Sequence, residues 1–339
     1  MSSRIGVIGL GPMGRRHCEA VKMILDGEIV AVCDLLLDKV NLIKDEYSVK
    51  NGYYNFEEML EKQHLDLLIV ATNGPSHAEL VIKAAKKGIK RILCEKPMAT
   101  KINDAKAMNA ICKANKVRLA VNHARRWLPS YQRLKTLLGK GVIGDIKNIT
   151  FEMAGGQLAS NGGHFWDLVR FLTDDEPASV IGFIDKTGTP HPRGKQFEDP
   201  GAFGLILMKK GTRIFFDMSE DYGVPFFMEI MGTVGRILID EKACKWKVYA
   251  RKQVDRDQPF TRRLPLERIS FEGERMDMIE SCKNAINELL DNCNIRCTGV
   301  DGLKSLEMTV AVHKSERNNN QTVTIPLSES DNEMQYKFT

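Results

Sequence analysis

The fold of this chain follows from one segment near its start, Arg4-Ile5-Gly6-Val7-Ile8-Gly9-Leu10-Gly11-Pro12-Met13-Gly14. It is a short apolar run, typical of a strand, that ends in the pattern GxGxxG and leads into a segment with helical periodicity. In such a unit the first glycine permits a tight turn, the second lets the backbone approach a pyrophosphate, and the third lets helix and strand pack closely. The helix start also offers N–H groups to phosphate. The stretch therefore predicts a dinucleotide site whose contacts come from Gly9, Gly11, Pro12, Met13 and Gly14.

The end of the second expected strand, residues 29–33, indicates which dinucleotide is bound. Asp34 follows this strand, 20 residues after Gly14, where an acidic side chain can hydrogen-bond the adenosine ribose hydroxyls. The same carboxylate would repel a 2′-phosphate, and residues 35–37 are three leucines with no arginine to receive one. We therefore expect NAD in preference to NADP.

Strand and helix patterns alternate through the first part of the chain, up to about residue 122. Strands are expected at residues 4–8, 29–33, 65–71, 92–94 and 117–121, and helices at 14–25, 36–46, 76–88 and 102–115. This alternation predicts a parallel sheet with helices on both faces. Residues 1–122 are thus expected to form an α/β Rossmann domain that binds NAD.

The alternation of strand and helix patterns ends after residue 122. One more helix is expected at 129–139, followed by strands at 146–153, 179–184, 202–208, 212–218, 226–231 and 236–240, and by helices at 274–292 and 302–314. Residues 123–339 are therefore expected to form an α+β domain with a mostly antiparallel open sheet, for substrate binding and oligomerisation. We expect residues 188–200 to be a surface loop and the polar tail after Pro326 to be loosely held.

Composition and charge exclude several classes of function. The net charge of the 339 residues is +5, and basic residues are interspersed with acidic ones, so no nucleic-acid partner is expected. No stretch has the length and hydropathy of a signal core or a membrane span, so no membrane partner is expected. The eight cysteines form no CxxC pair and no metal-ligand set, so we expect no metal and a reducing cytoplasmic location.

Lys96 is the strongest candidate for chemistry. It stands in Cys94-Glu95-Lys96-Pro97, directly after the expected strand 92–94, and ligands of open α/β sheets bind at the carboxyl ends of the strands. A lysine desolvated beside a cofactor can have its pKa lowered toward neutrality and act as acid or base. The alternative is a surface lysine whose stem lies along apolar neighbours.

Several motifs together resemble the Gfo/Idh/MocA family, the relatives of glucose-fructose oxidoreductase and inositol dehydrogenase. Besides the glycine fingerprint they are Ala71-Thr72-Asn73-Gly74-Pro75-Ser76-His77, Glu95-Lys96-Pro97, Arg125-Arg126-Trp127-Leu128-Pro129, Gly163-His164-Phe165-Trp166-Asp167 and Gly299-Val300-Asp301-Gly302. They extend over about residues 4–326. The resemblance implies a Rossmann domain followed by an α+β domain whose open sheet often forms the interface of a homodimer or homotetramer.

The resemblance also implies roles for particular residues. It places Lys96 at the reacting oxygen as catalytic, substrate-binding and cofactor-binding residue, Glu95 near the nicotinamide ribose, and Thr72, Asn73 and His77 along the cofactor. It makes His164 the substrate-facing residue of the second domain and an assisting acid or base. The alternative for His77 is a helix cap, and for His164 a structural hydrogen-bonding role.

The chain departs from the inositol-dehydrogenase type at Ser160, where such members carry an aspartate four residues before the histidine. A serine cannot orient an imidazole as a carboxylate does, which shifts the acid/base role toward Lys96 and makes inositol a poor substrate hypothesis. Asn161 is expected to supply a substrate hydrogen bond instead. Arg126 is expected to bind an anionic substrate group, with a salt bridge as the equal alternative.

These observations predict an NAD-dependent dehydrogenase or reductase that transfers hydride to or from a hydroxyl or carbonyl carbon of a sugar or nucleotide sugar, in the cleft between the domains. Two alternatives stay open. One is a glycosidase of the same fold that holds NAD and oxidises its substrate transiently. The other is a non-catalytic sensor that binds NAD and a regulatory partner.

Overall fold

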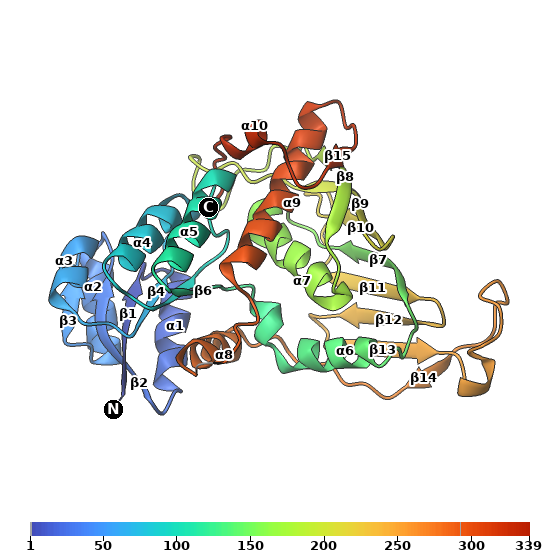
Figure 1. Cartoon of the computed structure of the whole chain (residues 1–339), viewed down its shortest axis with the longest axis horizontal. Helices are drawn as coiled ribbons and strands as arrows, with labels where there is room; N and C mark the ends of the chain where they lie inside the picture. The colour runs from blue at the N-terminus through green and yellow to red at the C-terminus, as the bar shows by residue number, and fades with distance from the viewer. Residues whose placement is uncertain (1, 292) are drawn as a thin grey trace. The chain divides into compact units, whose positions relative to one another are not determined.

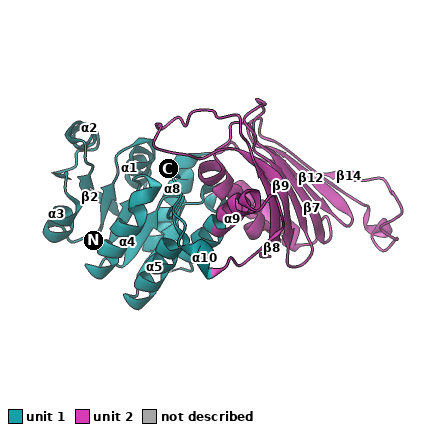
Figure 2. Ribbon diagram, turned by 90° about the horizontal axis from the view of Figure 1, so that it is seen from above, with its two compact units in different colours: residues 1–127, 277–306, 329–339 teal, residues 128–276, 307–328 magenta. Residues whose placement is uncertain are grey.

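The computed structural model describes residues 2–291 and 293–339, which form two compact units (Figure 1). Unit 1 consists of Met1–Trp127, Asp277–Leu306 and Glu329–Thr339, and unit 2 of Leu128–Met276 and Glu307–Ser328 (Figure 2). The first boundary lies close to the expected division between residues 122 and 123. Two later segments, which sequence analysis assigns to the second domain, belong to unit 1.

Unit 1 is a Rossmann domain, as predicted. Within the described residues it holds a parallel sheet of six strands in the order β3-β2-β1-β4-β5-β6. The strands are β1 (Ser3–Ile8), β2 (Gly27–Cys33), β3 (Asn51–Tyr53), β4 (Leu67–Val70), β5 (Arg91–Cys94) and β6 (Arg118–Val121). The helices between them are α1 (Pro12–Lys22), α2 (Leu37–Tyr47), α3 (Phe56–Lys62), α4 (Gly74–Lys86) and α5 (Ile102–Ala114). Every residue of β4 is buried, as expected for a parallel strand covered on both faces.

Helix α8 (Met278–Leu290) packs its apolar face into the core of unit 1. Cys282, Ala285, Ile286 and Leu289 recur at helical spacing and join the unit 1 core, and α8 packs against α1. Asp277 starts the helix by accepting hydrogen bonds from the N–H groups of Ile279 and Glu280.

The expectation of a loosely held tail is wrong. After α10 (Glu329–Asn332), the side chain of Phe338 is fully buried in unit 1, and the N–H of Tyr336 donates to the carbonyl of Thr100 at 3.0 Å. Glu333 forms an ion pair with Lys101. The tail is polar in overall composition, but it contains two aromatic side chains, and these supply its packing.

Unit 2 has the predicted mostly antiparallel sheet. In the part of the chain that the structure describes, nine strands follow the order β14-β13-β12-β11-β7-β10-β9-β8-β15, and the parallel pair is β10 with β7. The strands are β7 (Ile146–Glu152), β8 (Pro177–Ile184), β9 (Ala202–Met208), β10 (Arg213–Asp217), β11 (Phe227–Gly232), β12 (Gly235–Asp240), β13 (Lys245–Ala250), β14 (Glu267–Ile269) and β15 (Val323–Thr324). The unit's helices are α6 (Pro129–Gly139) and α7 (Gly163–Thr173), the latter preceded by a π-helical turn (Leu158–Gly162), and part of α9 (Gly299–Arg317).

One face of this sheet is covered by helices and the other is open (Figure 2). Trp166 of α7 packs on Phe151 and Phe216 of the covered face, where α9 also lies against Gly182. Trp166 is therefore a core residue. None of the helices that the described residues form has both the length and the apolar character needed to cross a membrane.

Candidate active site

The carboxyl ends of the parallel strands bring the predicted cofactor residues of unit 1 to one edge. Ile8, Cys33, Val70, Cys94 and Val121 end five strands, and each is a register partner of its neighbour in the sheet. The single residue that follows each of these strands, such as Gly9 after β1 and Asn122 after β6, therefore leaves the sheet beside its neighbours. Open α/β sheets hold their ligands at this edge.

The glycine loop is shaped for close approach by a phosphate. Gly9 has φ of +87°, and a side chain there would meet the backbone of Ala71. A Cβ on Gly14 would lie 1.8 Å from the carbonyl oxygen of Gly9, so only glycine lets α1 start so close to β1. A Cβ on Gly11 would meet no atom within 4 Å, so the loop faces open space at the start of α1. These features fit a bound dinucleotide.

Asp34 holds the same loop in place. Its Oδ2 accepts a hydrogen bond from the N–H of Leu10 at 2.7 Å, and its Oδ1 accepts from the N–H of Leu36 at 3.0 Å. Each carboxylate oxygen retains acceptor capacity, so the half-buried side chain can also receive ribose hydroxyls. The negative charge and the absence of arginine from residues 35–37 fit NAD.

Glu95 is turned into the interior of unit 1. Its Oε1 lies 2.7 Å from Nε2 of His17 in α1 and accepts a hydrogen bond of 2.7 Å from Nδ2 of Asn122. Burial alone would lower the pKa of His17, but neighbouring Cys282 and the Glu95 carboxylate raise it to about 10. Burial would raise the pKa of Glu95, but the bond with His17 lowers it below its usual value. Both pKa shifts are those expected of a buried ion pair between His17, on the helix that follows the glycine fingerprint, and Glu95, the residue before Lys96.

Lys96 is half-buried, and the backbone on either side of it is fixed. On one side stands the Glu95 ion pair, and on the other the carbonyl of Pro97 is 2.8 Å from Nδ1 of His77. The lysine thus leaves the end of β5 between two hydrogen-bonded neighbours, which suits a group that must meet a reacting atom.

His77 links two loops at this edge. Its ring is fully buried, with Nε2 3.0 Å from the carbonyl of Thr72 and Nδ1 close to that of Pro97. Burial lowers the pKa of His77 although both carbonyls favour the charged form. The neighbouring Thr72 is half-buried and Asn73 exposed at the end of β4, so they rather than His77 are open to a ligand.

Arg126 is engaged within unit 1. Its guanidinium donates to the carbonyl of Arg296 at 2.6 Å and to Oδ1 of Asp301 at 3.0 Å, and the side chain is buried. This arrangement favours the salt-bridge alternative over substrate binding. The adjacent Trp127 is also buried and donates to Glu288, which makes it a core residue.

In unit 2, Asn161 and His164 lie on one helical segment. The π turn carries Asn161, whose Nδ2 donates to the carbonyl of Gly156 at 3.2 Å, and α7 carries His164, which is half-buried. Ser160 is buried one turn before His164, and its N–H donates to Asp199. Asp167 is buried on α7, 3.8 Å from Arg170, in a structural position.

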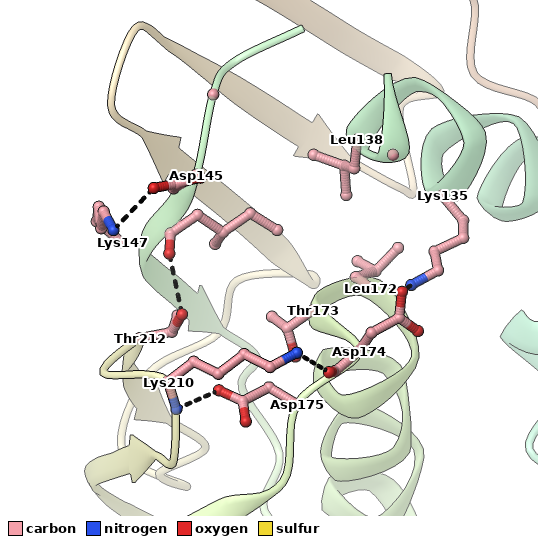
Figure 3. Close-up of a pocket in the computed structure, with 13 residues that line it drawn as sticks. Lys135, Leu138, Asp145, Lys147, Leu172, Thr173, Asp174, Asp175, Lys210 and Thr212 are labelled. Carbon is pink, nitrogen blue, oxygen red and sulfur yellow. Dashed lines mark hydrogen bonds and ion pairs between the residues drawn. The ribbon is translucent and has the colours of Figure 1, made fainter. Parts of the chain in front are cut away.

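A cavity of about 420 Å³ elsewhere in unit 2 holds none of the predicted site residues (Figure 3). Its lysines are engaged by neighbouring acidic residues and carbonyls: Lys147 with Asp145, Lys135 with Asp174, and Lys210 with the carbonyl of Asp174. Asp175 in turn accepts from the N–H of Lys210. The three lysines and three aspartates that line the cavity balance one another in charge.

Sequence reasoning did not identify His17, Asn122 or Asp199. His17 lies one turn after the fingerprint, but its partners are 78 and more residues away, and only the tertiary structure supplies them. Asp199, in Glu198-Asp199-Pro200, likewise lies in no local sequence pattern that predicts its contact with Ser160. An unexplained ionisable residue close to a motif is the signal that could have suggested His17.

Comparisons with known proteins identify relatives of this chain. Residues 3–123 match the model of an oxidoreductase family with an NAD-binding Rossmann fold, named GFO_IDH_MocA. The chain is 28% identical to myo-inositol 2-dehydrogenase of Thermotoga maritima over 328 residues, which cover 92% of this chain and 96% of that protein. It is 30% identical to inositol 2-dehydrogenase of Serratia proteamaculans over 254 residues, covering 69% and 73% respectively.

A solved structure shows the same fold. The WlbA dehydrogenase from Bordetella pertussis, in complex with NADH and UDP-GlcNAcA, superposes with a TM-score of 0.77 at 21% identity. The superposition covers 97% of this chain and all of that one.

Proposed function

The chain belongs to the Gfo/Idh/MocA family of NAD-binding oxidoreductases, and we propose that it transfers hydride to or from a hydroxyl or carbonyl carbon of a sugar or nucleotide sugar. The enzyme class, an oxidoreductase acting on CH–OH groups, is that of its relatives. The observation that carries the proposal is the placement of Lys96 directly beyond β5, on the strand edge that also bears the glycine loop and Asp34.

NAD supplies the hydride acceptor or donor when it is bound. The chain's own task is to hold the cofactor and move a proton. The N–H groups at the start of α1 hold the phosphates, and Asp34 receives the ribose hydroxyls. Nζ of Lys96 takes the hydroxyl proton during oxidation and returns it during reduction.

Other residues have supporting roles in this proposal. His164 assists Lys96 as a second acid or base, and Asn161 hydrogen-bonds the substrate. Glu95, paired with His17, fixes the orientation of Lys96, and His77 joins the Thr72 loop to the Pro97 loop. Thr72 and Asn73 contact the cofactor directly.

The substrate proposal rests on both relatives and residues. Its relatives include enzymes named for inositol, and the WlbA structure contains a nucleotide sugar. Ser160 separates this chain from the inositol type, so a sugar or nucleotide sugar is the preferred substrate and inositol the comparison compound.

We test the function by mixing purified protein with NAD and a panel of aldoses, nucleotide sugars and myo-inositol while following NADH absorbance. At least one sugar is expected to give sustained NADH formation, and Lys96→Ala to lower kcat by about 10²- to 10⁴-fold, the usual contribution of a general acid or base. Lys113→Ala, an exposed lysine on α5, is the matched control.

Other results of this assay would identify a different function. Release of a cleaved sugar without net NADH would indicate the glycosidase. NAD binding without turnover of any compound, or a Lys96→Ala variant as active as the wild type, would contradict the dehydrogenase.

We also propose that the protein is a homodimer or homotetramer that assembles through the open face of the unit 2 sheet. Phe183, Phe203, Leu207, Phe215 and Phe227 on this face are between 37% and 43% exposed. Several large exposed apolar side chains on one face of a sheet are typical of an interaction surface.

A further inference from the structure

A buried carboxylate in unit 2 is unexplained by the proposed roles. Asp199 is 5% exposed and lies at the end of the connection between β8 and β9. Its Oδ1 accepts a hydrogen bond of 2.7 Å from the N–H of Ala159, and its Oδ2 one of 2.9 Å from the N–H of Ser160. Burial raises the pKa of Asp199, while these bonds from the Ser160 turn oppose the rise.

The two N–H groups belong to the start of the helical segment that carries Asn161 and His164. The residue before the segment, Gln157, has a left-handed backbone with φ of 65°, so no preceding helical turn supplies acceptors. The first N–H, that of Leu158, donates to the carbonyl of Pro200 at 3.0 Å. Residues 199 and 200 thus receive the first three N–H groups of the segment, which is the function of a helix cap.

This cap is connected directly to the proposed site. Ser160 is four residues before His164 and therefore lies one helical turn away on the same side. Asn161 immediately follows the capped residues, and its N–H closes the turn on the carbonyl of Gln157 at 2.7 Å. A shift of the Ala159–Ser160 backbone would move both side chains together.

We propose that Asp199 is a positioning residue of the active site, which holds the Leu158–Gly162 turn so that Asn161 and His164 meet the substrate. The inference rests on the proposed function, since it assigns His164 and Asn161 a part in the reaction. Ser160 provides no carboxylate from within the helical segment. The β8–β9 connection instead places the carboxylate of Asp199 against the backbone of Ser160.

The variant Asp199→Asn separates positioning from simple stability. Asparagine keeps one acceptor but turns an N–H donor toward the other N–H group, so the turn loses a bond at nearly constant volume. We expect kcat to fall by about 10- to 100-fold, as small misplacements of reacting groups do, while the Kd for NAD stays within about twofold. Asp221→Asn, an exposed carboxylate of the same unit, is the matched control.

A double-mutant cycle with His164→Ala shows whether the effect passes through His164. Because Asp199 is proposed to place Asn161 as well, the background for the cycle also carries Asn161→Ala, and adding Asp199→Asn to the combined His164→Ala and Asn161→Ala variant changes kcat by less than about twofold. A full additional loss of about 10-fold or more in that background overturns the proposal. So does a variant that melts at lower temperature but keeps wild-type kcat and KM.

A second measurement does not depend on turnover. Diethyl pyrocarbonate modifies accessible imidazoles, and peptide mass spectrometry follows His164 and the exposed His64 of unit 1 separately. Asp199→Asn is expected to change the rate at His164 by about threefold or more and to leave His64 unchanged; an unchanged rate at His164 overturns the proposal. If the wild type oxidises no compound, the proposed function fails, and the reactivity of His164 alone decides the role of Asp199.

Discussion

At the scale of single residues, the glycines of the fingerprint have separable duties. A Cβ on Gly14 collides with the carbonyl oxygen of Gly9, whereas a Cβ on Gly11 enters open space. We expect Gly14→Ala to lower both thermal stability and NAD affinity, because α1 must move away from β1. Gly11→Ala should keep the melting temperature and weaken NAD binding by about tenfold or more, because the new methyl group occupies the path of the phosphates.

Calorimetry and fluorescence titration with NAD measure the two quantities on the same samples. An equal loss of stability in both variants would contradict the separate roles of Gly14 in helix packing and of Gly11 in phosphate binding. So would unchanged NAD affinity in Gly11→Ala.

The buried pair of His17 and Glu95 predicts a dependence of stability on pH. The folded-state pKa of His17 is raised from 6.5 to about 10, so its contribution is fully present below pH 6.5 and is lost as the pH rises through about 10. The pKa of Glu95 is lowered from 4.5, so its contribution is present above that value and is lost on acidification.

Urea denaturation from pH 6.5 to 10 is therefore expected to show a fall in unfolding free energy for the wild type and a flatter profile for His17→Gln. At pH 6.5 the variant should be less stable by about 3 kcal/mol, the order found when a buried pair loses one partner. Parallel pH profiles for the two proteins would contradict the ion pair.

These residues also show how far sequence reasoning reaches. The glycines, Asp34 and Lys96 are visible because a strand, a turn and a helix follow one another along the chain, so local order determines their neighbours. His17 and Asp199 are not, since their partners lie directly after β5 and in the turn before α7, and their pairing depends on how distant segments pack.

At the scale of elements, the most regular segments were predicted best. The helix at Pro129–Gly139 has the expected bounds, and the apolar run at residues 65–71 contains β4. Short elements such as β3 and α3 were not predicted, because three to seven residues carry too little periodicity. Helix α8 was predicted as a helix but assigned to the second domain, because its apolar face does not say which core it joins.

The start of α8 gives a test of that assignment. Asp277 caps the helix, so Asp277→Ala should lower the unfolding free energy by about 1 kcal/mol. Asp291→Ala, at the other end of the same helix, removes a charge that the helix dipole disfavours and should be neutral or slightly stabilising. Saturating NAD should raise the unfolding free energy of the wild type and of Asp277→Ala by the same amount if both bind it equally, so the loss caused by the variant should be unchanged. A variant whose stability equals the wild type would show that the cap is unimportant.

At the scale of the whole molecule, the order of the strands explains where the two kinds of surface arise. The parallel sheet of unit 1 is covered on both faces and offers a ligand its carboxyl edge. The antiparallel sheet of unit 2 is covered on one face, and its alternating side chains place a second apolar set on the other. Phe183 and Phe203 stack there with ring centroids 5.0 Å apart.

That open face leads to a prediction about assembly. Sedimentation velocity of the wild type at micromolar concentration is expected to show a dimer or tetramer, and Phe203→Asp combined with Phe215→Asp to shift it toward monomer. Burying charge in an interface core without a partner opposes association, whereas the same charge is solvated on a free monomer. Val254→Asp introduces one such charge at an apolar residue that is 82% exposed on the connection between β13 and β14, and serves as the control for added charge outside the sheet face. A wild type that sediments as a monomer, or a double variant that assembles as the wild type does, would mean that this face serves another purpose.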